Sequence, residues 1–171
     1  MPPMLAAIVC QVLLLAYHQI TTLVDFYPFN AARNYSRSER LAEVGVNAVL
    51  MVLPPVGFIF RLNGLMLFGV IYYFVLLFIE IIIWWVPYLT IPADSWRKAY
   101  NLILSLATSN FEEGDTLDNW VAIHQRVHRG TITPLKPGRG PILPNLEHMI
   151  LHGWTVVTAV ATLAAYLSYR P

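Results

Sequence analysis

Four long apolar stretches constrain this chain more than any other feature of its sequence. They cover approximately residues 4–24, 41–60, 65–89 and 146–168. A helix needs about 20 apolar residues to cross the hydrocarbon core of a bilayer, and each stretch is close to that length or exceeds it. Only 12% of the residues are charged, about half the share of a soluble domain. The sequence predicts an all-α integral membrane four-helix bundle, a single membrane domain over residues 1–171.

The residues between and within these stretches indicate how the helices are joined. Arg61-Leu62-Asn63-Gly64 is predicted to be a tight turn, which makes the second and third helices antiparallel neighbours. Pro54-Pro55 is expected to bend or break the second helix, because proline cannot donate a backbone hydrogen bond. Ser36 or Ser38 is the expected cap of that helix. The third stretch ends in aromatic residues that predict an interfacial belt: Trp84, Trp85 and Tyr88.

The connection over residues 91–144 is expected to leave the membrane as an interfacial helix followed by a structured loop. Asp94 is the expected cap of the interfacial helix, whose apolar stripe comprises Trp96, Ala99, Tyr100, Ile103 and Ala107. A break is expected over Asn110–Asp115. A second short helix, capped by Asp115 or Thr116, then ends near Gly130. Glycines and prolines predict an irregular loop over residues 130–144.

The single cysteine and the first residues of the chain argue against a disulfide, a Cys-x-x-Cys motif and a signal peptide. Cys10 is the only cysteine, so an internal disulfide and a Cys-x-x-Cys metal or redox motif are excluded. The first residues lack the basic segment of a signal peptide, so we expect a retained membrane helix from Met4 onward.

The basic residues predict the orientation of the bundle. The first and third connections lie on one side and carry nine basic residues: Arg33, Arg37, Arg40, Arg97, Lys98, Arg126, Arg129, Lys136 and Arg139. The other side has only Arg61 and Arg170. Because basic loops stay in the cytoplasm, we expect a multi-pass protein of the cell (inner) membrane. Both termini are expected outside and both long connections inside.

This orientation predicts a polar layer at the cytoplasmic end of the bundle. Gln11, His18 and Asp25 are seven residues apart and share a face that is expected to point inward. At about 1.5 Å per residue, His18, Glu80 and His152 fall at similar depths. All five histidines belong to this layer, and Glu43 lies at the inner end of the second helix.

Two His-x-x-x-His pairs predict a metal site. Residues at i and i+4 of a helix project side by side, so His124 with His128 and His148 with His152 can each offer two imidazoles to one ion. Glu147 adds a carboxylate, and such a set suits zinc or iron. The two pairs resemble the histidine boxes of membrane desaturases and hydroxylases, which lie at the cytosolic edge of a helical bundle. Those enzymes carry adjacent His-His pairs, and this chain has none.

Glu80, His18 and His152 are the predicted catalytic residues, because an ionisable group within a span is a functional candidate. The structural alternative for Glu80 is a hydrogen bond to His18 or a tyrosine, and for Asp25 and Glu43 it is capping or pairing with Arg33, Arg37 or Arg40. Four basic residues beside the histidines could bind an anionic head group or cofactor: Arg126, Arg129, Lys136 and Arg139. The alternative is that they only fix the topology.

Three classes of function stay open at this point. The first is a metal-dependent hydrolase or oxidoreductase that acts on a lipid-like substrate. The second is a non-enzymatic subunit, or a protein binding haem b through His18 and His148 or His152. The third is a small transporter that uses the interrupted second helix. Membrane lipids are the expected partners, with a homo-oligomer or a larger complex left open and no nucleic acid.

Overall fold

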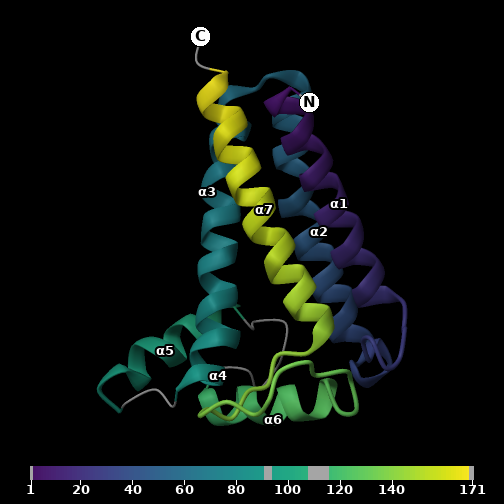
Figure 1. Cartoon of the computed structure of the whole chain (residues 1–171), viewed down its shortest axis with the longest axis vertical. Coiled ribbons are helices and arrows are strands. Elements are labelled where there is room, and N and C mark those ends of the chain that lie inside the picture. Colours follow the sequence, from purple (N-terminus) through teal and green to yellow (C-terminus); the bar gives the residue numbers. More distant parts are fainter. Residues whose placement is uncertain (1, 91–93, 108–115, 170–171) are drawn as a thin grey trace.

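The computed structural model describes residues 2–90, 94–107 and 116–169, and all the regular structure in these ranges is helical (Figure 1). Four long helices match the predicted apolar stretches: α1 (Pro3–Leu23), α2 (Arg37–Phe60), a rod over Asn63–Leu89, and α7 (Leu146–Ser168). Each is long and apolar enough to cross a membrane. The break expected over Asn110–Asp115 lies outside the described residues.

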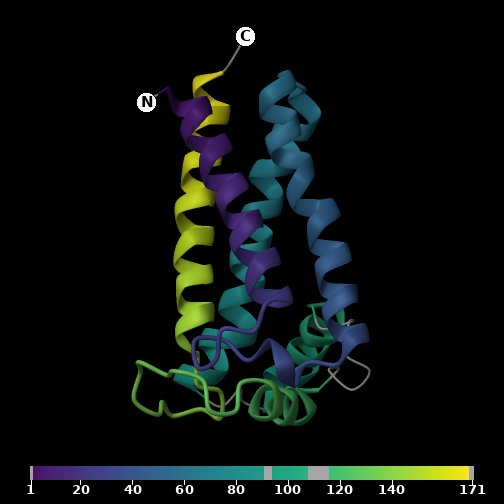
Figure 2. The ribbon, with the colours of Figure 1, turned by 90° about the vertical axis from the view of Figure 1, so that its right-hand side faces the viewer.

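The four helices form a closed ring in which α1 packs on α2 and α7, and α3 packs on the same two neighbours. Helix α1 begins and α7 ends at one end of the bundle, and the long connections gather at the other end (Figure 2). We call these the far end and the site end. The turn between α2 and α3 is at the far end, where Arg61 takes a left-handed conformation with φ 56°.

The rod contains a π-helical turn that the sequence analysis did not anticipate. It consists of α3 (Asn63–Glu80), the π-helical η2 (Ile81–Trp85) and α4 (Val86–Leu89). Pro87 has no N–H to donate to the carbonyl four residues earlier. That carbonyl belongs to Ile83, and it accepts a hydrogen bond from Trp120 Nε1 at 3.0 Å instead. Pro87 is the sequence signal for this irregularity, because π-turns accompany such interruptions.

The break predicted at Pro54-Pro55 is wrong, because α2 runs as one α-helix from Arg37 to Phe60. Both prolines are buried against the neighbouring helices. A Cβ added to Gly69 of α3 would lie 2.9 Å from the Pro54 Cβ, so only glycine permits this approach. Close packing against α3 thus supports α2 where its hydrogen-bond ladder is interrupted. Ser36 is the cap, in a capping box with Glu39.

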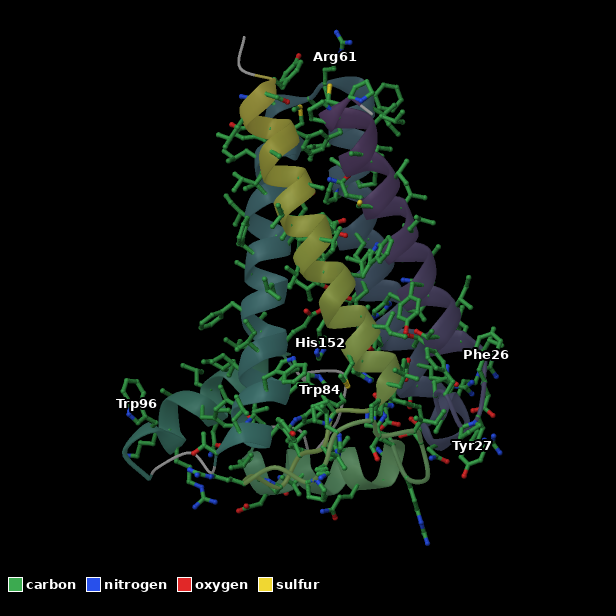
Figure 3. The ribbon with its side chains drawn as sticks, in the orientation of Figure 1. Phe26, Tyr27, Arg61, Trp84, Trp96 and His152 are labelled. Atoms are coloured by element: carbon green, nitrogen blue, oxygen red, sulfur yellow. The ribbon has the colours of Figure 1, made fainter. Side chains whose placement is uncertain are left out.

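The site end is closed by short helices and the loop around them. They are the 3-10 helix η1 (Ala32–Asn34), α5 (Asp94–Ala107) and α6 (Leu117–Val127), which Thr116 caps as predicted. The stripe predicted on α5 is divided between two environments: Tyr100 is buried with Leu104 against the bundle, whereas Trp96 is 71% exposed (Figure 3). Packing of α5 on α6 and η2 draws Tyr100 inward and leaves Trp96 outside.

Candidate functional site

Trp84 lies at the centre of four histidines. Its ring centroid is 3.9 Å from that of His148, in a stacked arrangement, and 5.1 to 5.8 Å from those of His124, His128 and His152. The prediction that Trp84 belongs to an interfacial belt is therefore wrong, since it is only 4% exposed. The π-helical turn places Trp84 inward within this cluster.

His124 and His128 come from the buried face of α6, with ring centroids 4.9 Å apart. His124 bonds to the backbone of Leu143, and its Nε2 has no partner among the described residues. Its Nδ1–H is therefore the donor to the Leu143 carbonyl, which leaves a buried lone pair on Nε2. Burial lowers the pKa of His124 to about 4. Burial and the neighbouring His124 also lower the pKa of His128, so both rings are neutral at pH 7.

Asn145 connects the two histidine-bearing helices and fixes their tautomers. As the cap of α7, its Oδ1 accepts from the His148 backbone N–H at 3.1 Å, which sets the orientation of the amide. The same Oδ1 is 2.8 Å from His148 Nδ1, so that nitrogen carries the proton. The Nδ2 group faces His128 Nδ1 at 3.3 Å. His128 therefore accepts at Nδ1 and donates from Nε2 to the Tyr35 hydroxyl, 3.4 Å away.

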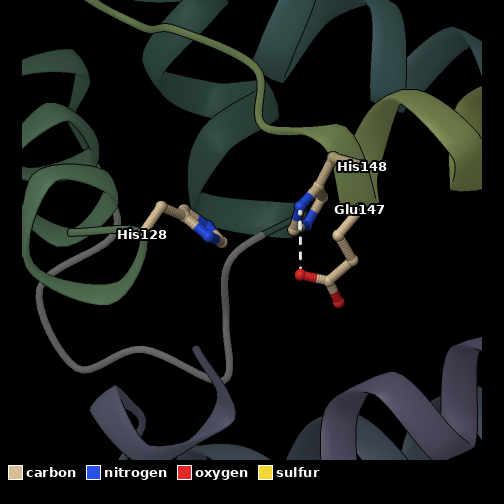
Figure 4. Close-up of side chains that lie close together, drawn as sticks. All are labelled: His128, Glu147 and His148. Atoms are coloured by element: carbon tan, nitrogen blue, oxygen red, sulfur yellow. Dashed lines mark ion pairs between the residues drawn. The ribbon is translucent and has the colours of Figure 1, made fainter. Parts of the chain in front are cut away.

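Three side chains can meet on a metal ion: His128, Glu147 and His148, with candidate ligand atoms all within 4.8 Å of one another. Glu147 Oε2 lies 3.8 Å from His148 Nδ1 (Figure 4). In a tetrahedral zinc site the ligand atoms lie roughly 3.4 Å apart. The donor set suits zinc or iron chemically, and the three side chains must close by about 1 Å or slightly more to bind one ion.

His152 was predicted as a metal ligand, but the part of the chain that the structure describes does not bring it into this group. Trp85 Nε1–H donates to His152 Nδ1 at 3.0 Å. The proton of the neutral ring is therefore on Nε2, and Nε2 is buried without a partner among the described residues. His124 likewise lies outside the three-residue group, although its ring contacts His128.

A cavity of about 20 Å³ lies beside the group, and it is large enough for a water molecule. Its polar lining includes His18, Tyr35, Glu43, Glu147 and His148. His18 Nε2 is 3.5 Å from Glu43 Oε1, which forms a partly buried acid–base pair. The structure thus places His18 at the cluster, in contact with the cavity.

Glu80 lies one layer further into the bundle and is 5% exposed. Its Oε1 accepts from the Thr155 hydroxyl at 2.9 Å. The structural alternative for Glu80 named His18 or a tyrosine as its hydrogen-bond partner, but the partner in the described residues is Thr155 of α7. His152 lies three residues before Thr155 on α7, whereas His18 lines the cavity.

Asp25 and the four basic candidates lie outside the buried site. Asp25 is exposed and pairs with Arg33 at 2.8 Å, so the inward face predicted for α1 is confirmed only for Gln11 and His18. Arg126 pairs with Glu39 at 2.6 Å. The other three basic candidates are exposed: Arg129, Lys136 and Arg139. Arg139 lines an outer groove with Arg97 and Asp118.

Several residues of the site were not assigned to it from the sequence: Tyr35, Trp84, Trp85 and Asn145. Asn145 carried a usable signal, because an asparagine before an apolar run is a typical cap. Tyr35 and the two tryptophans carried none. Comparison with protein-family models, with curated proteins and with solved structures finds no match for this chain. The site geometry therefore carries the functional argument by itself.

Proposed function

We propose that this chain is a membrane-embedded, metal-dependent hydrolase whose site faces the cytoplasm and acts on a lipid-like substrate. One observation carries the proposal: two imidazoles and a carboxylate from α6 and α7 gather within 4.8 Å beside a water-sized cavity. Two histidines and a glutamate form a ligand set of catalytic zinc, and the same chemistry accommodates iron.

The hydrogen bonds around the group support particular ligand atoms. His148 Nδ1 faces Glu147, and His128 Nδ1 faces the Asn145 amide. An ion held by these two nitrogens would take the place of that amide at His128 and would require the His148 proton to move from Nδ1 to Nε2. His128 keeps its Nε2–H bond to Tyr35, the kind of outer contact that orients metal-binding histidines. Because the histidines must be neutral and the glutamate ionised to hold an ion, affinity would fall as the pH falls.

The cavity favours hydrolysis over oxidation. A bound zinc ion would lower the pKa of a water molecule in the open position. The cavity has room for such a water, and the His18–Glu43 pair in its wall can accept the proton that the water loses. The cavity is too small for a lipid head group, so the substrate must open the site from its membrane side.

The charge distribution supports a cytoplasmic site. The described basic residues concentrate at the site end, and Arg61 lies at the far end (Figure 3). A test uses Cys10→Ser protein with Thr133→Cys in the exposed loop. In intact cells a membrane-impermeant maleimide should leave this cysteine unlabelled and should label it after permeabilisation. Labelling of intact cells would place the site outside.

The other classes have less support. A haem between His18 and His148 or His152 needs space for a porphyrin, and the cavity beside these rings holds about 20 Å³. A transport path would have to cross the far end, where Ala7, Phe58, Met66 and Ala165 pack into an apolar cluster.

Metal analysis of detergent-purified protein tests the proposal. We expect close to one zinc or iron per chain, and more than about 100-fold weaker binding after Glu147→Gln or His148→Asn. His152→Asn is the matched control, because it changes a buried histidine of the same helix outside the group, and it should keep the metal. Wild-type protein that takes up neither ion after metal addition would falsify the site. Iron with oxygen consumption would replace hydrolysis by oxidation.

A further inference from the structure

Glu80 is a buried carboxyl group that the proposed metal chemistry does not use. Among the described residues no cation pairs with it, and its Oε2 has no hydrogen-bond partner. Within the described part of the chain, its carboxyl group accepts one hydrogen bond, from the Thr155 hydroxyl. An ionised carboxylate without a cation is costly inside a membrane, so the neutral acid is the favoured form.

Two neighbouring contacts between the rod and α7 place Glu80 close to His152. One is the bond from Trp85 to His152, and the other is the bond from Thr155 to Glu80. His152 and Thr155 are three residues apart on α7, which puts their Cβ atoms about 5–6 Å apart. Glu80 Oε2 and His152 Nε2 are both buried and unpartnered among the described residues. A water held between these two atoms would give each of them a hydrogen-bond partner.

The polar seam that contains Glu80 continues toward the site end and stops before the far end. Above Glu80 it continues through Thr158 and then Gln11, which donates to Thr162 at 2.9 Å. It ends at the apolar cluster of the far end. Below Glu80 it leads to His152 and the histidine cluster. A proton on Glu80 can therefore exchange with solvent through the site end.

We propose that Glu80 is a proton-binding site within the bundle, which exchanges its proton with the histidine end through a water held by His152. The Nε2–H of His152 donates to this water, and Glu80 Oε2 passes its proton to the same water. The water releases one of its own protons, which passes to the His18–Glu43 pair at the cavity, so Glu80 becomes a carboxylate and the water stays neutral. His152 acts as a positioning residue in this step. The proposal does not depend on a bound metal.

Infrared spectroscopy of the full-length protein in lipid tests the proposal. We expect a protonated carboxyl C=O band that Glu80→Gln removes and that Thr155→Val shifts to higher frequency, because the Thr155 hydrogen bond is lost. In D2O this band should exchange in wild-type protein. His152→Leu should slow the exchange by about tenfold or more, since the water loses its donor.

His152→Gln is the matched variant, because its amide can still donate to the water, and it should restore the exchange rate. An unchanged elution volume and thermal unfolding transition in His152→Leu would show that the variant is folded. A missing carboxyl band in wild-type protein overturns the proposal, because Glu80 is then ionised. Equal exchange rates in wild-type protein and His152→Leu overturn the role of His152. Protein that shows the band and binds no metal retains this inference and loses the proposed enzyme.

Discussion

The two ends of the bundle differ in the polarity of their buried side chains. At the far end Ala7, Phe58, Met66 and Ala165 form a dry apolar cluster. At the site end Trp84 lies among four imidazoles, and His18, Glu43 and Glu147 line a cavity. Apolar packing holds the helices together at the far end, whereas the polar groups of the site end cost free energy to bury.

This contrast predicts that damage to the far end changes stability and leaves the metal site intact. Phe58→Ala removes a fully buried ring and should lower the free energy of unfolding by about 3–5 kcal/mol. Thermal unfolding in detergent, followed by loss of the monodisperse elution peak, measures the change. The metal content of the folded fraction should equal that of wild-type protein. Loss of metal would show that the two ends are coupled.

Protonation of buried histidines at the site end should lower the stability of the protein at acidic pH. The pKa of His124 is about 4 in the folded protein and 6.5 in an ordinary environment. Between these values the unfolded chain binds more protons, so stability is present above pH 6.5 and falls as the pH falls toward 4. The free energy of unfolding that His124 contributes, and that is lost in acid, is at most about 3 kcal/mol. His124→Gln in metal-free protein should flatten the stability profile over this range, and an unchanged slope would contradict a neutral buried His124.

A comparison of two N-cap residues at the site end distinguishes an effect on helix stability from an effect on metal binding. Ser36 caps α2, and Asn145 caps α7 and also bridges His128 and His148. Alanine at either position should cost about 1 kcal/mol of stability. Only Asn145→Ala should change metal affinity, and it should raise it by up to about tenfold, because the metal no longer competes with the bridging hydrogen bonds.

The control for this pair is Asn145→Ser. Serine preserves the cap but cannot reach both imidazoles, so stability should stay near wild type while metal affinity rises. Isothermal titration with zinc measures the affinities. Weaker zinc binding in Asn145→Ala would mean that the amide supports the ligands, and the displacement step would be wrong.

The sequence predicted the four long helices closely, because length and apolar composition are local properties. It also predicted that histidines far apart in the chain meet at one end, since helices that alternate in direction bring them there. It did not predict which groups touch. The contacts of Trp84, Tyr35 and Asn145 depend on the π-helical turn and on the loop before α7, and these follow from long-range packing. The break that Pro54-Pro55 allowed was wrong for the same reason, since Gly69, which packs on Pro54, lies on another helix.

The outer surface of the site end should respond least to mutation. Arg126 pairs with Glu39 at 2.6 Å and donates to the Asn34 carbonyl, but its side chain is about half exposed. Exposed ion pairs contribute roughly 0–1 kcal/mol, and salt screens them. Arg126→Ala should therefore lower stability by less than about 1 kcal/mol at low salt, with a smaller difference at high salt. Thermal unfolding of both proteins at two salt concentrations measures this. A larger, salt-independent loss would mean that Arg126 holds η1, and with it Tyr35, against the histidine cluster, so that the boundary between surface and site lies further out than the buried imidazoles.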